Sequence, residues 1–279
     1  MAEQKYIVGI DVGGTFTDLL CLNTESQELL SEKVPSIPGK QWEGVLGALE
    51  KLGIDYSEIR AFVHGTTIAT NALLERQGDR TLFVTTHGFG DALRIGHQAR
   101  PRLFDRHIIL PELLYEEVLE VEERLDANGE VITPLDEKAA KKGLQAAYDR
   151  GIRAVAIAFM HGYSNAIHEE QVAAIAKEIG FTQISVSKQV SPLMKLISRG
   201  DTTVVDAYLS PILRRYVDQV AEQLGEGPRL MFMQSNGGLT DARLFQGKDA
   251  ILSGPAGGVV GMVRTASMSG YDKIIGFDM

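Results

Sequence analysis

The chain has 279 residues, 44% of them hydrophobic and 23% charged. These values are typical of a folded globular protein and exclude a coiled coil or a disordered chain as the overall class. At about 150 residues per domain, the length predicts one or two domains. The net charge of −9 is opposite to the basic excess of a non-specific nucleic-acid binder, so we expect no nucleic-acid partner.

Cysteine usage and the N-terminal residues favour a cytoplasmic location. The one cysteine, Cys21, cannot form an intramolecular disulfide, which fits a reducing compartment. The first residues, MAEQKYIVGI, lack the charged-then-apolar layout of a signal peptide. The longest apolar run, 154–160, is far shorter than the roughly 20 residues that span a bilayer, so no membrane partner is expected.

The first half of the chain contains short apolar runs separated by turns and helical patterns. The runs predict strands over 5–10, 16–22, 28–34, 59–64 and 80–85. Apolar spacing of three and four predicts helices over 39–52 and 66–76. From residue 88 to about 135 the pattern is irregular, with a strand over 118–125 and a hairpin turn at 126–129. This middle part is the best candidate for an inserted or adjoining small region.

The second half alternates more regularly. Helices are predicted over 136–150, 165–179 and 201–224, the last with Pro211 expected to kink it. Strands are predicted over 153–160, 183–186, 229–233 and, as a buried strand at the end, 273–279. A glycine-rich turn at 253–261 is expected to lead into a helix that ends near residue 268. The alternation of buried strands with amphipathic helices predicts the α/β class.

The segment Asp11-Val-Gly-Gly-Thr-Phe-Thr-Asp18 has the composition of a phosphate-binding turn. Gly13 and Gly14 let the backbone approach a phosphate with no Cβ in the way, and successive N–H groups can form an anion-binding concavity. Thr15 and Thr17 add hydroxyl donors. The two terminal aspartates offer the oxygen ligands that Mg²⁺ prefers. An ordinary hairpin turn is the alternative, since the glycine spacing is neither the P-loop nor the Rossmann fingerprint.

The segment His64-Gly-Thr-Thr67 lies where a predicted strand meets a predicted helix. Gly65 gives the backbone the freedom that a tight turn needs. Thr66 and Thr67 can cap a helix whose N-terminus would suit a phosphate or a carboxylate. His64 is a candidate acid–base group. The alternative is that a threonine merely caps the helix and His64 is an ordinary strand-end residue.

Two glycine-rich segments follow nearer the C-terminus. Ser253-Gly-Pro-Ala-Gly-Gly-Val-Val-Gly261 either packs a helix closely against another element or contacts a nucleotide, with Gly254, Gly257 and Gly258 as the contacts. Ser235-Asn-Gly-Gly238 is a turn, in which Asn236 is a candidate to line a cleft.

A group of basic residues stands out in this acidic chain and could receive a carboxylate or a phosphate, unless it is a solvated loop. Within this group, Arg94 is the candidate to contact the substrate. The group also contains His97, Arg100, Arg102, Arg106 and His107. His161 and His168 do not have the spacing of a zinc motif.

Together these segments resemble the hydantoinase A/oxoprolinase family. The resemblance rests on residues 11–18, 64–67 with 69–76, 161–165, 203–211 and 253–258, which follow one another in order along nearly the whole chain. The family includes ATP-dependent 5-oxoprolinases, N-methylhydantoinases and one subunit of acetone- and acetophenone-type carboxylases. Its fold is that of the actin-like, sugar-kinase and Hsp70-like ATPases, with a ribonuclease H-like lobe.

The resemblance implies ATP and Mg²⁺ as cofactors, held in a cleft between two lobes. Residues 11–18 would be the first phosphate loop and 253–261 the connecting helix. The strand at the end would carry a further metal ligand, Asp278, and the chain would stop before the second phosphate loop. We therefore expect residues 1–190 to form the family's N-terminal domain and 191–279 the start of its core domain.

The resemblance also implies a reaction, the phosphorylation of the carbonyl oxygen of a hydantoin or 5-oxoproline type of cyclic amide, followed by hydrolysis. Asp11, Asp18 and His64 would act in catalysis, with Thr66, Thr67, Arg94 and Asn236 on the substrate side. The alternatives are the nucleotide-binding subunit of an acetone-type carboxylase, acting on a ketone, and a truncated lobe with a structural or partner-binding role. A sugar or acetate kinase shares only the first loop. A hydantoinase B-like subunit and a second copy of the chain are the protein partners to consider.

Overall fold

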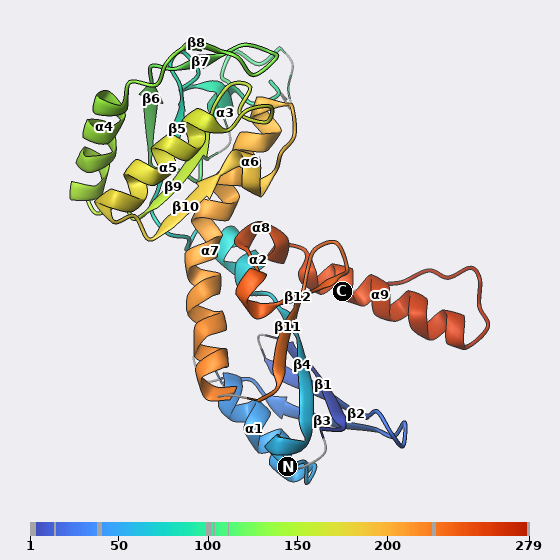
Figure 1. The fold of residues 1–279 in the computed structure, drawn as a ribbon. Coiled ribbons are helices and arrows are strands. Elements are labelled where there is room, and N and C mark those ends of the chain that lie inside the picture. The colour runs from blue at the N-terminus through green and yellow to red at the C-terminus, as the bar shows by residue number, and fades with distance from the viewer. Residues whose placement is uncertain are drawn as a thin grey trace. The chain divides into compact units, whose positions relative to one another are not determined.

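The computed structural model describes residues 4–13, 15–37, 41–98, 102, 104–110, 112–224 and 227–277. The chain divides into two compact units, residues 1–75 with 213–279 and residues 76–212, whose elements are labelled in Figure 1. These units are defined by packing, whereas the predicted boundary at residue 190 concerns family domains and stays a prediction. None of the described helices is long and apolar enough to cross a membrane.

The first unit is built on a six-stranded sheet. Its strands are β1 (Tyr6–Val12), β2 (Phe16–Asn23), β3 (Leu29–Pro35), β4 (Ile59–Thr66), β11 (Arg229–Met233) and β12 (Leu239–Asp241). They lie in the order β12-β11-β4-β1-β2-β3. The first three strands form an antiparallel meander, while β4 pairs parallel with β1 and β11 pairs parallel with β4.

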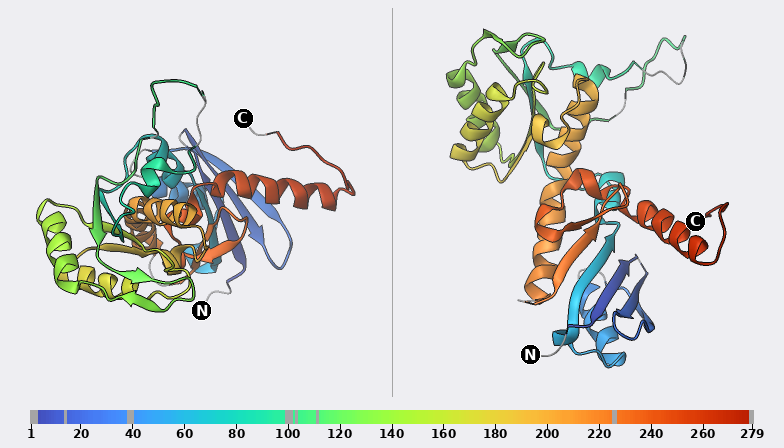
Figure 2. Two further views of the ribbon diagram at one scale, coloured as in Figure 1. Left: turned by 90° about the horizontal axis from the view of Figure 1, so that it is seen from above. Right: turned by 45° about the vertical axis from the view of Figure 1, so that its right-hand side comes forward.

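The two faces of this sheet differ. Along β1, Val8, Ile10 and Val12 are buried and Asp11 is exposed, because successive side chains point to opposite faces. Helix α1 (Gln41–Lys51) packs on β2 and β3 on the buried side. Short elements follow, η1 (Tyr56–Glu58), α2 (Ile68–Leu74), η2 (Ala242–Leu244) and α8 (Gly247–Ala250), before helix α9 (Ser253–Met268). Helix α9 packs on β4 and β11, and beyond its first residues it extends away from the sheet in the right-hand view of Figure 2.

The second unit has a four-stranded parallel sheet. Its strands are β5 (Thr81–Thr86), β6 (Glu117–Val121), β9 (Ala154–Ala158) and β10 (Gln183–Val186) in the order β10-β9-β5-β6, with a hairpin of β7 (Arg124–Leu125) and β8 (Val131–Thr133). Its helices are α3 (Ala92–Ile95), α4 (Glu137–Asp149), α5 (Ile167–Ile179), α6 (Ser187–Val190) and the first part of α7 (Leu196–Leu224). One core packs α4 and α5 on the sheet, and another packs α3 and α7 on its other face.

Most predicted elements are present, and two segments near the C-terminus differ. The strands over 183–186 and 229–233 are confirmed, and α7 begins five residues before its predicted start and runs through Pro211 as one helix. Residues 253–261, expected as a turn, are already helical. Residues 273–277, expected as a buried strand, form none, and Ile275 is 98% exposed. A strand needs a neighbour for its backbone groups, and these described residues pair with none.

Candidate functional site

Asp11 and Asp18 stand side by side on the exposed face of the first sheet. The strand register pairs Asp11 with Asp18 on one side and with Gly65 on the other. A Cβ at Gly65 would lie 3.5 Å from Oδ1 of Asp11, so glycine leaves space beside this carboxylate. Asp18 lies opposite Lys33, whose Nζ is 2.9 Å from its Oδ1. The structure thus brings together the two described aspartates that the sequence proposes as metal ligands.

The turn between β1 and β2 is held by Ser36. The Gly13 N–H donates to the Phe16 carbonyl at 3.0 Å, and a Cβ at Gly13 would lie 3.0 Å from that oxygen, which favours glycine. Ser36 Oγ donates to the Gly13 carbonyl at 2.8 Å and lies 2.9 Å from Thr17 Oγ1, while its N–H donates to the Thr15 carbonyl at 2.9 Å. Sequence reasoning missed Ser36, because a lone serine after a strand carries no pattern.

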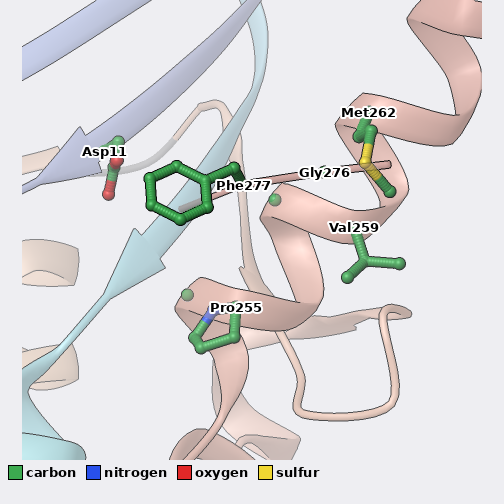
Figure 3. Close-up of a pocket in the computed structure, with 8 residues that line it drawn as sticks. Asp11, Pro255, Val259, Met262, Gly276 and Phe277 are labelled. Carbon is green, nitrogen blue, oxygen red and sulfur yellow. The ribbon is translucent and has the colours of Figure 1, made fainter. Parts of the chain in front are cut away.

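A cavity of about 560 Å³ lies beside Asp11, within the usual size range of small-molecule sites. Figure 3 shows Asp11 and the Phe277 ring on one side and the part of α9 that carries Pro255, Val259 and Met262 on the other. The cavity is lined by Asp11, Gly254, Pro255, Gly258, Val259, Met262, Gly276 and Phe277. Two of the three glycines proposed for nucleotide contact therefore line it, and the third, Gly257, instead faces Met233.

The glycines of α9 have no packing reason among the described residues. A Cβ would lie 3.9 Å from its nearest neighbour at Gly254 and 3.6 Å at Gly257, and would meet nothing within 4 Å at Gly258 and Gly261. Glycine inside a helix costs about 1 kcal/mol relative to alanine. No close contact among the described residues requires glycine at these positions. This fits a helix surface that a bound molecule or another part of a larger protein contacts.

His64 lies on the opposite face of the sheet, in the core. It is 1% exposed, its Nδ1 is 2.5 Å from the Gly65 carbonyl oxygen, and its Nε2 is 2.6 Å from Tyr216 Oη. Its ring stacks on Phe232 with the centroids 5.1 Å apart. Burial lowers the pKa of His64 to about 4. These surroundings do not fit the acid–base role expected from the sequence; they fit the alternative, a strand-end residue with satisfied ring nitrogens.

Two of the proposed threonines also turn away from the aspartates. Thr17 is fully buried on the core face and bonds Ser36, so its hydroxyl is not a phosphate donor here. Thr66, 2% exposed, accepts from the Ile68 N–H at 3.3 Å at the start of α2, which is the capping alternative. Thr67 stays near α9, since a Cβ at Gly254 would lie 3.9 Å from its Cγ2.

The remaining candidates are spread over the chain. Asn236 is exposed and accepts from the Gly238 N–H at 2.8 Å, so it stabilises its own turn. Arg94 is exposed on α3 of the second unit. Thr15 is exposed in the turn after β1. Gly14 and Asp278 lie outside the described residues.

The sequence matches known families over nearly its whole length. Residues 7–180 match the hydantoinase/oxoprolinase N-terminal region, and residues 199–279 match hydantoinase/oxoprolinase. The chain belongs to the hydantoinase/oxoprolinase family. This family member is 38% identical to 5-oxoprolinase of Saccharomyces cerevisiae, an alignment that covers 100% of the chain and 25% of that relative. It is 31% identical to caprolactamase subunit alpha of Pseudomonas jessenii, over 100% of the chain and 42% of the subunit.

Two solved structures share the fold of this family member. The ATP-dependent caprolactamase from Pseudomonas jessenii superposes with a TM-score of 0.84 at 30% identity, over 98% of the chain and 42% of that structure. Nucleotide-free acetone carboxylase gives a TM-score of 0.84 at 22% identity, over 96% of the chain and 41% of that structure. The mixed α/β architecture is therefore the one expected of an actin-like ATPase lobe. The chain spans between a quarter and about two fifths of the length of these relatives.

Proposed function

We propose that this chain provides the Mg-ATP-binding lobe of an ATP-dependent cyclic amide hydrolase of the 5-oxoprolinase and caprolactamase type. The observation that carries the proposal is the position of Asp11. Asp11 is the last residue but one of β1, lies opposite Asp18 in the strand register, and lines a cavity of about 560 Å³ together with Gly254 and Gly258. A cation site and a glycine-lined surface thus adjoin one space that is large enough for a small-molecule ligand.

The residues present fit a bound Mg²⁺. Magnesium is commonly held by one or two carboxylates, with waters and substrate phosphates completing its shell. Two like charges directly opposite each other on neighbouring strands destabilise a sheet, and a cation between Asp11 and Asp18 would relieve that repulsion. The Lys33–Asp18 pair is half exposed and contributes little stability, so Asp18 can exchange it for a metal at small cost.

The residues also fit the phosphates of ATP, which when bound would supply the phosphoryl group that activates a carbonyl oxygen for hydrolysis. Glycine at positions 254 and 258 keeps Cβ atoms out of the cavity, and the turn at Gly13, fixed by Ser36, places a backbone without a side chain next to Asp11. Oriented backbone groups and a positioned cation are how proteins stabilise phosphoryl charge. His64 takes no part in this scheme, since the Gly65 carbonyl and the Tyr216 hydroxyl occupy its ring nitrogens.

The proposal extends to a protein partner and to the class of substrate. Because the caprolactamase relative is named as a subunit, a hydantoinase B-like subunit is the protein partner we propose, and a second copy of the chain is the alternative. The substrate is a small cyclic amide. A cytoplasmic location stays a prediction of the sequence.

Calorimetric titration of the 279-residue chain with Mg-ATP tests the proposal. We expect saturable binding that weakens at least about tenfold in Asp11→Asn, because one lost charge-assisted contact is worth about 1.5–3 kcal/mol. Asp149→Asn, an equal change on the exposed surface of α4, should bind like the unaltered chain. Equal affinity of the Asp11 variant and the unaltered chain would rule out the assigned site, and no binding by any of them would favour a lobe with only a structural role.

A further inference from the structure

A row of three charged side chains crosses the exposed face of the first sheet. The strand register places Asp11, Asp18 and Lys33 directly opposite one another on β1, β2 and β3. Residues two positions apart on a strand share a face, and on β2 the residues that flank Asp18 in this way are Phe16 and Leu20, which are 46% and 50% exposed. The three charges therefore lie in one row with apolar side chains on either side.

Lys33 is the only basic residue of β1, β2 and β3, all of which the structure describes in full. Its Nζ lies 2.9 Å from Oδ1 and 3.0 Å from Oδ2 of Asp18. It also lies 5.4 Å from the centroid of the Phe16 ring, within the distance at which an aromatic face attracts an ammonium group. The ammonium group is thus held by a ring and a carboxylate of the same strand.

The charges in this row do not balance when a metal and a phosphate are both bound. The carboxylates of Asp11 and Asp18 carry two negative charges, which already equal the charge of the Mg²⁺ ion that they are proposed to hold. The phosphates of a nucleotide add further negative charge beside these carboxylates, and like charges repel one another. A second cation is therefore needed near the aspartates, and Lys33 is the basic residue that the register places there.

Lys33 is close enough to meet a ligand of the two aspartates. Neighbouring strands are about 4.8 Å apart, so Lys33 lies two strands from Asp11, which lines the cavity. Its Nζ has already crossed to Asp18, the residue between them. The Lys33–Asp18 pair is half exposed, and pairs of this kind contribute little stability. The ammonium group can therefore turn from the carboxylate to another oxygen at small cost.

We propose that Lys33 is a phosphate-binding residue of the nucleotide site. Its Nζ pairs with Asp18 in the unliganded chain and donates a hydrogen bond to a phosphate oxygen when Mg-ATP is bound. A lysine ammonium group has three hydrogens to donate, and it binds phosphate as a point charge. This inference rests on the proposed function and adds one residue to the same site.

Titrations with Mg²⁺ alone and with Mg-ATP, followed by the backbone amide NMR signals of Asp11 and Asp18, test the proposal. Lys33→Met keeps an unbranched apolar stem and removes the charge. Mg-ATP should bind this variant about tenfold more weakly, as expected for the loss of one charge-assisted hydrogen bond. Mg²⁺ alone should bind it up to about fivefold more tightly, because no ammonium group competes for Asp18. A merely structural role of Lys33 would not give these opposite changes.

Two further variants control for charge and for folding. Lys33→Arg keeps the positive charge and should bind Mg-ATP within about threefold of the unaltered chain, because the charge that offsets the phosphates is retained. Lys51→Met removes an equal charge where Lys51 pairs with Glu32, and both of its titrations should match those of the unaltered chain.

Three results would overturn the role of Lys33. These are equal Mg-ATP affinities of Lys33→Met and the unaltered chain, weaker binding of both ligands by Lys33→Met, and a Lys33→Arg variant that binds Mg-ATP as weakly as Lys33→Met. Failure of the proposed function looks different, because the unaltered chain itself would then bind no Mg-ATP.

Discussion

The imidazole of His64 is enclosed between the Phe232 ring and the Tyr216 hydroxyl, with the Gly65 carbonyl at its other nitrogen. Since a carbonyl oxygen only accepts, Nδ1 carries the hydrogen and Nε2 accepts from the tyrosine. This is a neutral tautomer, and burial lowers the pKa of His64 from 6.5 to about 4. His64 therefore acts as a structural residue with a built-in sensitivity to acid.

This arrangement predicts a pH dependence of folding stability. In the unfolded chain His64 binds a proton near pH 6.5, whereas in the folded chain it does so only near pH 4, so the unfolded state binds more protons in between. The contribution of the neutral His64 side chain to the free energy of unfolding is fully present above pH 6.5. It falls as the pH drops towards 4, by roughly 3 kcal/mol in total at about 1.4 kcal/mol per pKa unit. Urea unfolding at several pH values measures it.

A pair of variants separates this histidine from the others. In His64→Phe the stability between pH 6 and 4.5 should fall less steeply, by up to about 1.4 kcal/mol per pH unit, whatever the variant's absolute stability. His107→Gln, at an exposed position, should keep the slope of the unaltered chain. The same slope in His64→Phe would show that His64 is not the group that titrates.

Helix α9 combines four glycines with little internal contact, and this allows stability and binding to be separated. Gly258 lines the cavity with Asp11, whereas Gly261 does not. Alanine at either position should slow amide exchange in α9 by up to about fivefold, because it removes about 1 kcal/mol of helix penalty. Only Gly258→Ala should also weaken Mg-ATP binding, since its methyl group enters the cavity. Normal Mg-ATP affinity in Gly258→Ala would contradict the assignment of this surface to the nucleotide.

Elements with a strong local pattern could be predicted from the sequence. Residues 183–186 alternate polar and apolar side chains and 230–233 are all apolar, and the structure has strands over 183–186 and 229–233 with the predicted bounds. Residues 253–261 were harder, because glycine usually signals a turn while the hydrogen bonds of α9 run through it. Residues 273–277 have a strand-like composition, but strand formation depends on a neighbour, which a local pattern cannot supply.

The site could be predicted only in part for a similar reason. The motif at 11–18 placed two aspartates near each other, and the strand register does bring them to one face. It could not say that Thr17 points to the core and Asp18 to solvent, because that depends on which face of the sheet α1 covers. Nor could it find Ser36, which acts from a position 23 residues after Gly13.

At the scale of the whole molecule, each unit has its own hydrophobic core. We therefore expect a destabilising substitution in one core to reduce protection from hydrogen exchange in that unit alone. Leu144, fully buried in the second unit, leaves a cavity when replaced by alanine, at a cost of about 2–5 kcal/mol. Hydrogen exchange should then accelerate in β5 and β9 and stay unchanged in β1 and β2. Phe232→Ala in the first unit should give the reverse pattern. Equal acceleration in both sheets would show one cooperative unit instead.

The discontinuity of the first unit has a consequence for biosynthesis. Strand β4 ends at Thr66, and its neighbour β11 begins at Arg229, 163 positions later. At about 5–20 residues per second, the ribosome needs roughly 8–30 s to make the intervening chain. During that time the contiguous second unit can fold while β4 has an unpaired edge. Until β11 has been made, that edge of β4 is open to mispairing with other strands, and a chaperone that binds unpaired strands would cover it.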